Sequence, residues 1–527
     1  MPIKVIDLFA GPGGLGEGFS AYHQKGEQVF KIAISIEKED SAHRTLLLRA
    51  LFRQYDHKYV PEEYYAFLRG ELGKHPEDEL YQLPKIQKHL ETAKLEAQKL
   101  TLGEESQRTI YKKIRDAIGK DECILIGGPP CQAYSLVGRS RNYGAKEKNY
   151  SATEDKRNFL YQEYLKIISK FQPQVFVMEN VKGILSAKID GQLIFESIRN
   201  DLQNPFKSTK VPPESGRETH KYKIYSFVSK TDDTELDPHN FIIRTEDYGL
   251  PQARHRVILL GIREDIASGL GDFQRLKLSE DYPTVQQAIS DLPKIRSRLS
   301  KGLDSAENWR EAINSISNST LRNLSRDTLV PSKVYDGFIH RLKKVCNSPK
   351  SVGKDKGQIK NTDYNHRLPN KLKKWYKDPC LGNYVINHES RGHITGDLHR
   401  YLYYSTYAKI MGNSPNANNL PKVLWPNHKN FDTGKFADRF RVQLAKAPGT
   451  TVTCHISKDG HYFIHYDPIQ CRSLTVREAA RIQTFPDNYY FVGNRTQQYV
   501  QVGNAVPPYL AKQLAHIVSY ILGNKKT

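Results

Sequence analysis

Cys131 is the residue of this sequence that is best placed to act as a nucleophile. An apolar run over residues 124–126 has the length and branching typical of a buried strand. Two glycines and two prolines follow at 127–130, so the backbone is first freed and then restricted directly before the cysteine. A strand that delivers a thiol onto a rigid loop could present it for covalent catalysis. A buried cysteine in a strand-to-loop turn fits the pattern equally well, and these residues alone leave both interpretations open.

Charged side chains are predicted to reach the same edge of a sheet. A second buried strand ends in the carboxylate Glu179, which has the same position relative to its strand as Cys131 has to its own. Arg254 and Arg256 alternate on an extended segment before a strongly apolar strand, so they share one face. Two arginines at this place are costly unless they meet carboxylates or phosphates. The pattern therefore predicts that a thiol, a carboxyl group and two guanidinium groups converge.

A glycine-rich turn near the amino terminus is suited to an adenosine-type ligand. A short strand over residues 4–9 runs into AGPGGLGEG at 10–18, and a helix is predicted over 19–25. This arrangement brings backbone N–H groups and a helix amino end close to a nucleotide-like ligand. The next strand, at 30–36, ends in Glu37, about 20 residues beyond the loop, where a carboxylate can bind the hydroxyls of a ribose. Together the two features favour an adenosine-containing cofactor, whereas a glycine-rich turn by itself needs no ligand.

The composition indicates a globular protein that meets a polyanion. The chain has 527 residues, enough for two or three domains, and a net charge of +21. Residues 294–378 hold 20 Lys and Arg against 8 Asp and Glu, which favours nucleic acid as a partner over a merely basic surface. No apolar run reaches 18 residues and no C-x-x-C pair occurs, so we expect no membrane span, signal peptide, disulfide framework or metal site. A reducing cytoplasm is expected.

The remaining segments indicate an insertion and a separate domain. Residues 46–100 carry hydrophobic side chains at helical spacing among charges, which predicts a helical insertion. From about 282 to 448 the chain is rich in Asn, Ser, Lys and Tyr and poor in periodicity, which predicts an irregular domain. A helix with Thr475 as its N-cap is predicted within 472–483, and a last helix over 509–521.

Six short motifs resemble the cytosine-5 DNA methyltransferase family and occur in the order of that family. They are Asp7–Gly14 (DLFAGxGG), Gly128–Ser135 (GPPCQxYS), Glu179–Val181 (ENV), Gln252–Arg256 (QxRxR), Arg472–Pro486 (RxLTxREAARIQxFP) and Gln501–Val506 (QVGNxV). No single motif is decisive, but chance does not place six in order. The resemblance implies an α/β fold: a Rossmann-like, S-adenosylmethionine-dependent methyltransferase with a mixed sheet, helices on both faces and a smaller irregular target-recognition domain.

The resemblance also implies a division of the chain. Residues 1–284 would form the catalytic domain with the cofactor and cytosine sites, interrupted by the insertion at 46–100. Residues 285–445 would form the basic target-recognition domain, and 446–527 a segment that returns to the catalytic domain. The insertion is not typical of the family. A second departure is Tyr134, which replaces the usual Phe of the nucleophile loop.

Four residues take catalytic roles by this resemblance. Cys131 is implied to add to C6 of a flipped-out cytosine, which makes C5 a nucleophile for a methyl group. Glu179 is implied to hydrogen-bond or protonate N3 of the ring. Arg256 would hold the cytosine O2 and orient Glu179, and Arg254 would serve a phosphate or the basic loop after the nucleophile. No residue is identified as the base that removes the C5 proton.

The resemblance implies S-adenosylmethionine as the methyl donor and no metal. The residues implied to bind it are Phe9, Ala10, Gly11, Gly13, Gly14, Glu37, Glu104, Pro130, Asn504 and Val506. Among them, Phe9 would lie against the adenine ring and Glu37 would take the ribose hydroxyls. Glu104 is the expected partner of the adenine amino group, at a place where the insertion disturbs the spacing of the family.

The expected function is site-specific transfer of a methyl group to C5 of cytosine in double-stranded DNA. We expect a monomeric, cytoplasmic enzyme of a bacterium or phage that modifies DNA in a restriction-modification system, with a restriction endonuclease as its functional partner. A tRNA cytosine-5 methyltransferase of the same fold and an inactive DNA-binding relative are the alternatives. The long basic domain favours duplex DNA over tRNA, and intact Cys131, Glu179 and Arg256 argue against an inactive protein.

Overall fold

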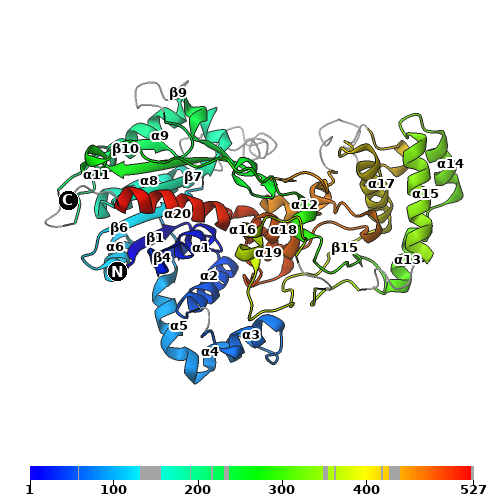
Figure 1. Ribbon diagram of the computed structural model, residues 1–527, viewed down its shortest axis with the longest axis horizontal. Coiled ribbons are helices and arrows are strands. Elements are labelled where there is room, and N and C mark those ends of the chain that lie inside the picture. Colours follow the sequence, from blue (N-terminus) through cyan, green and yellow to red (C-terminus); the bar gives the residue numbers. More distant parts are fainter. Residues whose placement is uncertain are drawn as a thin grey trace.

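A mixed β-sheet with helices packed around it lies in the left half of Figure 1, which shows the computed structural model. The described residues are 1–56, 59–130, 156–189, 192–214, 218–230, 237–347, 354–360, 364–416, 419–426 and 440–523. Within them the sheet has eight strands, in the order β10-β13-β7-β6-β1-β4-β5 with β11 paired to β13. These strands are β1 (Ile3–Leu8), β4 (Phe30–Glu37), β5 (Ala97–Lys99), β6 (Cys123–Gly127), β7 (Val175–Val181), β10 (Tyr222–Ser226), β11 (Ile242–Arg244) and β13 (His255–Arg263).

The strand directions bring the predicted site residues to one edge of the sheet. Strands β7, β6, β1, β4 and β5 run parallel to one another, so their carboxyl ends meet at the same edge. Strand β13 runs antiparallel to β7 and pairs Arg256 with Val181, which places the start of β13 at this edge as well. The predicted mixed α/β fold is confirmed, and its topology explains why residues from distant motifs meet.

Side chains alternate across the sheet and fill two cores. In β6, Cys123 and Leu125 face one core, and Ile124 and Ile126 face the other. The helices on the first face are α6 (Gln107–Ile118), α8 (Lys156–Phe171) and α9 (Ile194–Gln203), and those on the second are α1 (Gly14–Ser20), α11 (Glu264–Gly269) and α20 (Pro508–Gly523). Helices therefore cover both faces, as the sequence predicts.

Helix α1 begins earlier than the sequence predicts. The predicted helix spans residues 19–25, whereas α1 starts at Gly14 and the chain then forms the short hairpin of β2 (His23–Gln24) and β3 (Glu27–Gln28). Glycine has a low helix propensity, so the run of glycines indicates a loop. Packing of α1 on α20 and β4 overrides that propensity.

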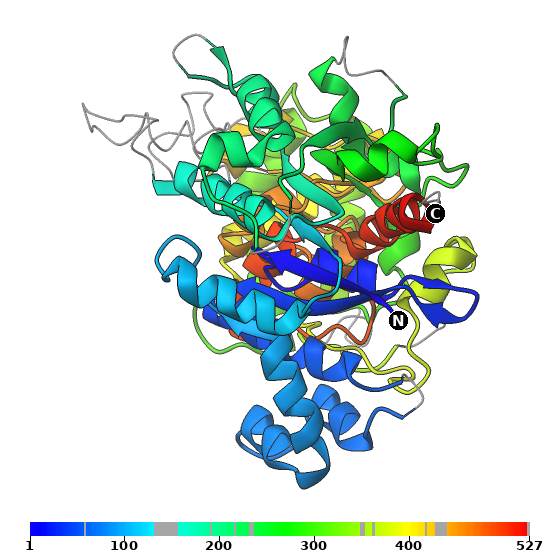
Figure 2. The ribbon, with the colours of Figure 1, turned by 90° about the vertical axis from the view of Figure 1, so that its left-hand side faces the viewer.

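A group of helices follows β4 and extends away from the sheet, as Figure 1 and Figure 2 show. It consists of α2 (Asp40–Arg53), α3 (Glu62–Arg69), α4 (Pro76–Gln82) and α5 (Pro84–Glu96). These helices share a small core that includes Leu51, Tyr64 and Leu90. The buried guanidinium of Arg49 lies 2.5 Å from the carboxylate of Glu17 on α1, so an ion pair joins the group to the glycine-rich loop.

The central part of the chain is more regular than its composition predicts. It contains α13 (Ala306–Asn314), α14 (Asn318–Arg326), α15 (Ser332–Asn347), α16 (Asn370–Tyr376) and α17 (Thr395–Met411). Helices α13, α15 and α17 share a core that includes Trp309, Phe338 and Tyr401. Serines that indicate a loop are helix N-caps here, because Ser305 accepts from Asn308 N–H and Ser317 from Thr320 N–H.

Three short helices connect the sheet to this central part. They are α12 (Val285–Ile289), α18 (Val476–Ile482) and α19 (Arg495–Asn504), which share a core. The predicted N-cap is confirmed: Thr475 begins α18 and forms a reciprocal capping box with Glu478. Arg481 of α18 is fully buried, and its guanidinium binds the carboxylates of Asp291 and Asp487 at 2.8 and 2.6 Å.

Several short elements complete the structure. They are α10 (Pro205–Thr209), β8 (Lys188–Ile189), β9 (Gln192–Leu193), β12 (Gln252–Ala253), β14 (Arg298–Leu299), β15 (Gly392–His393) and β16 (Gly449–Thr450). In the part of the chain that the structure describes, no helix has the length and apolar character needed to cross a membrane.

The two ends of the chain pack against each other without room for a side chain. A Cβ atom on Gly14 would lie 2.2 Å from the carbonyl oxygen of Val506. A Cβ atom on Gly18 would lie 2.4 Å from the carbonyl oxygen of Pro508 and 2.4 Å from Cβ of Ala511. Glycine is therefore required where α1 meets the start of α20.

Substitution of Gly18 tests this contact. We expect Gly18→Ala to lower the free energy of unfolding by about 1–3 kcal/mol, because the added methyl group overpacks the contact between α1 and α20. Gly271→Ala is the matched control, since a Cβ atom there meets no heavy atom within 4 Å. Denaturant unfolding of both variants measures the difference. Equal stability of the two variants would contradict the proposed close contact.

Candidate active site

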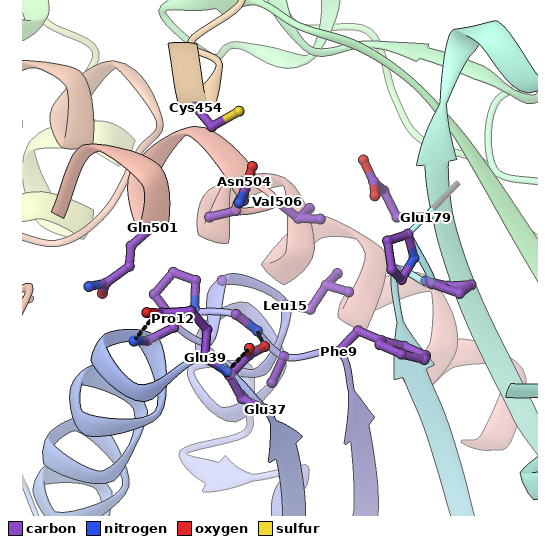
Figure 3. A pocket seen from close by; sticks show the side chains of 18 of the residues that line it. Phe9, Pro12, Leu15, Glu37, Glu39, Glu179, Cys454, Gln501, Asn504 and Val506 are labelled. Atoms are coloured by element: carbon purple, nitrogen blue, oxygen red, sulfur yellow. Dashed lines mark hydrogen bonds between the residues drawn. The ribbon is translucent and has the colours of Figure 1, made fainter. Parts of the chain in front are cut away.

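A cavity of about 450 Å³ opens at the carboxyl edge of the parallel strands (Figure 3). Its lining includes Phe9, Gly11, Glu37, Pro130, Glu179, Arg254, Arg256, Cys454, Gln501, Asn504 and Val506. These residues come from loops after β1, β4 and β6, from β7, from the start of β13 and from the carboxyl-terminal part of the chain. One cavity thus joins the glycine-rich loop to the charged groups that the sequence predicts to be catalytic.

The carboxylate of Glu37 is fixed against the glycine-rich loop. Its Oε2 accepts the backbone N–H of Gly11 at 2.8 Å, and its Oε1 accepts those of Lys38 and Glu39 at 2.9 and 2.8 Å. Phe9 and Gly11 have φ values of +56° and +57°, which turn the loop sharply after β1. The loop and the carboxylate therefore form one preorganised side of the cavity, as the dashed lines of Figure 3 show.

Apolar side chains form the wall next to this carboxylate. Phe9, Leu15, Ile36, Leu100 and Leu102 all line the cavity. Such a wall suits a flat heteroaromatic ring, and the adjacent carboxylate suits hydroxyl groups. The pairing of an apolar surface with a fixed acceptor is the arrangement that an adenosine group needs.

Most of the residues expected to bind a cofactor meet in this lining. They are Phe9, Ala10, Gly11, Gly14, Glu37, Pro130, Asn504 and Val506. Gly13 does not line the cavity but has a φ of +96° directly before α1, and a Cβ atom there would approach Leu46 Cδ1 to 2.9 Å. Gly13 therefore shapes the loop from behind.

Glu104 lies outside the cavity lining. Its side chain is exposed, in a turn where its backbone N–H donates to the carbonyl oxygen of Thr101. Strand β5 pairs with β4 up to Lys99, and the chain then contributes Leu100 and Leu102 to the cavity before turning outward. The insertion ends in β5, and the path of the chain after β5 leaves Glu104 outside the cavity.

Glu179 and Arg256 form an ion pair at the other end of the cavity. Arg256 Nε lies 2.9 Å from Glu179 Oε1, and both side chains are about 85% buried, with exposed fractions of 16% and 13%. A Cβ atom on Gly128 would lie 3.0 Å from Glu179 Oε2, so the glycine allows the loop after β6 to approach the carboxylate. Gly128 to Pro130 line the cavity, and Cys131 lies outside the described residues.

Arg254 is buried beneath the site instead of facing solvent. Its side chain is 2% exposed, and Nη1 donates to the carbonyl oxygens of Val452 and Gly503 at 2.8 and 3.3 Å. Burial, with a smaller contribution from the charge of Arg256, lowers the pKa of Arg254 to about 9. These hydrogen bonds join the start of β13 to the carboxyl-terminal segments. Among the described residues Arg254 therefore donates to backbone carbonyl oxygens. The basic loop that the resemblance implies as its partner lies outside the described residues, so that role stays a prediction.

Asp7, Gln501 and Cys454 are among the lining residues to which sequence reasoning gave no role. Asp7 is fully buried at the end of β1, and this burial raises the pKa of its carboxyl group to about 8. Gln501 donates to the carbonyl oxygen of Val492 at 2.8 Å. Cys454 brings a second thiol to the cavity. Asp7 and Gln501 stand in motifs that the sequence marks, whereas no pattern points to Cys454.

Two histidines of the central part have hydrogen-bond partners in the protein. His388 is buried between Thr475 Oγ1 at 2.9 Å and the carbonyl oxygen of Pro293 at 2.8 Å. His399 Nε2 lies 3.0 Å from the carbonyl oxygen of Ala312. In the described ranges no group of three or more His, Cys, Asp and Glu side chains is arranged to hold a metal ion.

Comparisons with known proteins identify the family. The model of the C-5 cytosine-specific DNA methylases matches residues 86–204 and 217–519. The Type II methyltransferase M.Bpa9945I of Bacillus paralicheniformis is 33% identical over 98% of this chain and 99% of its own length. The Type II methyltransferase M.AgeI of Thalassovita gelatinovora is 26% identical over 77% of this chain and 86% of its own. The DNA (cytosine-5-)-methyltransferase M.ApeKI of Aeropyrum pernix is 25% identical over 77% and 82%.

A solved structure supports the same fold. The crystal structure of a DNA modification methyltransferase encoded within an E. coli prophage has a TM-score of 0.50 to this chain at 20% identity, and the match covers 99% of both chains. The family model spans most of this chain, and a relative 33% identical covers nearly all of it. The protein therefore belongs to the C-5 cytosine-specific DNA methylase family.

Proposed function

We infer that this protein methylates C5 of cytosine at a specific site in double-stranded DNA, as a modification enzyme of the Type II kind. Membership of the family and the Type II relatives support this function. The observation that carries it is the Glu179–Arg256 ion pair, which shares one cavity with the glycine-rich loop and Glu37. A carboxyl group that can act on a pyrimidine ring and a loop that can bind an adenosine group therefore line the same cavity.

The cavity fits S-adenosylmethionine as the cofactor. The apolar wall near Phe9 would take the adenine ring, the fixed carboxylate of Glu37 the ribose hydroxyls, and the segment of Asn504 and Val506 the methionine end. When bound, the cofactor supplies a methyl group on a sulfonium, which a carbon nucleophile can accept. The donors and the apolar surface of this chain match a ligand that has one flat ring, one diol and one charged end.

The cytosine half of the cavity supplies covalent catalysis. We propose that the thiolate of Cys131, which follows the described Pro130, adds to C6 of the base, so that electron density moves to C5. Glu179 would hold or donate a proton at N3 as this density develops. Arg256 fixes Glu179 Oε1 and would hold the cytosine O2, while Arg254 keeps the underlying backbone in place. A base paired within a duplex cannot reach such a cavity, so the cytosine must flip out.

We propose residues 285–445 as the domain that recognises DNA, between a catalytic part at 1–284 and a returning segment at 446–527. Figure 1 shows helices α13 to α15 far from the sheet. Exposed cations on α14 and α15 without an ion-pair partner among the described residues are Arg322, Arg326, Lys333, Lys343 and Lys344. Such cations can bind phosphates, which supports a role of this domain in holding the duplex.

The cellular setting follows from the relatives and is also a proposal. Several relatives are named Type II methyltransferases. We propose that this enzyme methylates DNA so that a restriction endonuclease of the same specificity does not cut it, and that it acts as a monomer in the cytoplasm of a bacterium or of a phage-infected cell. An endonuclease gene next to its own would support the pairing, and an isolated gene would argue against it.

Replacement of the nucleophile tests the reaction. We expect Cys131→Ser to lower transfer of a tritiated methyl group to duplex DNA by at least about 10³-fold, because an alcohol is a much weaker nucleophile than a thiolate. Cys380→Ser is the matched control, since Cys380 is exposed and outside the cavity. Transfer to tRNA is measured alongside. Equal activity of Cys131→Ser and the control, or transfer to tRNA alone, would refute the proposal.

A second substitution isolates the acid. Glu179→Gln keeps the shape of the side chain but removes the transferable proton, so kcat should fall by about 10²–10⁴-fold. The Kd for DNA and the midpoint of thermal unfolding should change little, which distinguishes a catalytic from a structural role. Glu264→Gln, at the exposed start of α11, serves as the control. An unchanged kcat in Glu179→Gln would show that another group acts at N3.

The salt dependence of DNA binding tests the recognition domain. We expect log Kd to rise steeply with log salt concentration, and the triple variant Lys333→Gln, Lys343→Gln, Lys344→Gln to reduce the slope by about one per lost phosphate contact. Lys88→Gln, on the exposed side of α5, should leave the slope unchanged. Filter binding at about 50 to 200 mM salt measures these slopes, because DNA affinity changes strongly over that range of salt concentration. Identical slopes for the triple variant and the wild type would place the phosphate contacts elsewhere.

A further inference from the structure

A second cavity, of about 780 Å³, lies on the face of the sheet that carries α1 and α20. It is bounded by α16, by α20 and by the loop at residues 274–281. None of its lining residues lines the active-site cavity. Its volume falls within the range of small-molecule sites in proteins, so the space is large enough for a ligand of its own.

Aromatic side chains form one part of this second cavity. The rings of Trp375 on α16 and Tyr509 on α20 have centroids 5.7 Å apart at an angle of 54°. The indole N–H of Trp375 donates to the carbonyl oxygen of Thr484 at 2.6 Å, which fixes the ring. Farther along α20, the hydroxyl of Tyr22 and Nδ1 of His516 are 2.8 Å apart. The cavity therefore offers held aromatic faces on which a planar group can stack.

Cations without carboxylate partners form the other part. Lys371 and Lys374 extend from α16, and Lys512 from α20, and none of the three has an ion-pair partner among the described residues. Lys512 is half-buried, and its Nζ lies 5.2 Å from the centroid of the Trp375 ring. Burial lowers the pKa of Lys512, and the charge of Glu17 opposes this shift. The ammonium groups are thus placed to meet an anion from outside the chain.

The remaining charges of the lining do not cancel this positive character. The loop at 274–281 adds Arg275 and Lys277, and its carboxylates are the exposed Glu280 and Asp281. The described lining therefore holds five cations and two anions. Arg275 pairs with Asp272 at 3.9 Å, and burial together with the charge of Asp281 raises the pKa of Tyr509. The excess positive charge comes from Lys277, Lys371, Lys374 and Lys512, which lie on three separate elements. A ligand that combines a planar aromatic ring with a phosphate meets both sets of side chains at once.

We propose that this second cavity binds a nucleoside 5′-phosphate unit. Its base would stack on one of the two tilted rings, Trp375 or Tyr509, and its phosphate would lie between Lys512 and the lysines of α16. The unit is a free nucleotide or the 5′-phosphorylated end of a nucleic-acid strand, and both present the same chemistry. The site shares no lining residue with the active-site cavity.

Binding of guanosine 5′-monophosphate to the full chain tests this proposal. Saturating S-adenosylhomocysteine fills the first cavity during the titration, and calorimetry measures Kd. We expect one saturable site, and a Kd at least tenfold weaker for guanosine, which lacks the phosphate. Lys374→Gln with Lys512→Gln should weaken binding at least tenfold, whereas Lys88→Gln should have no effect. Unfolding midpoints of the variants show whether the fold is retained.

The source of the unit is determined by comparing ligands. If the free monophosphate binds, a free nucleotide is sufficient as the ligand. If only the 5′-phosphorylated dinucleotide pGpG binds, the ligand is the end of a nucleic-acid strand. Absence of binding by both ligands overturns the proposal. Equal affinity of the double lysine variant and the wild type also overturns it, because the observed site would then lie elsewhere.

Discussion

The active site depends on the direct contact between the first and last helices of the catalytic part. A Cβ atom on Gly14 would lie 2.2 Å from the carbonyl oxygen of Val506, and one on Gly18 would lie 2.4 Å from that of Pro508. This contact holds Asn504 and Val506 against the glycine-rich loop, although the two segments are nearly 500 residues apart in the sequence. Without it, the loop after β1 and the carboxyl-terminal segment would not close one cavity. Glycine at these positions is a packing requirement as much as a conformational one.

Buried arginines connect the other parts to this contact. Arg254 bonds to the carbonyl oxygens of Val452 and Gly503, and Arg481 binds Asp291 and Asp487 beneath the central helices. Removing one partner of such a group leaves a buried charge uncompensated, which costs several kcal/mol, on the order of 3–5. The arginines therefore fix the geometry of the junction because few alternative packings satisfy their donors. The ion pair of Glu179 and Arg256 lines the same cavity as Arg254.

Sequence patterns predicted the elements whose signals are local. The buried strands before Gly128 and Glu179, the N-cap at Thr475 and the carboxylate of Glu37 at a strand end all follow from short runs of residues. Other elements were not predictable in this way. The glycines of α1 predict a loop, whereas the structure has a helix there that packs on α20. Ser305 and Ser317 likewise predict a loop, whereas in the structure they cap helices. For α1 the outcome depends on packing against residues far along the chain, whereas Ser305 and Ser317 act as caps through the local backbone of the helices that follow them.

Short motifs and the family resemblance that they carry were enough to predict the chemistry: a thiol at 131, an acid at 179, an arginine at 256 and an adenosine-type loop at 9–14. These predictions rest on residue type and order, which need no tertiary contact. The packing of distant segments, in contrast, buries Arg254 against backbone carbonyls, leaves Glu104 outside the cavity and brings Cys454 into its lining. The position of a side chain relative to a cavity depends on how distant segments pack, and no local pattern encodes that packing.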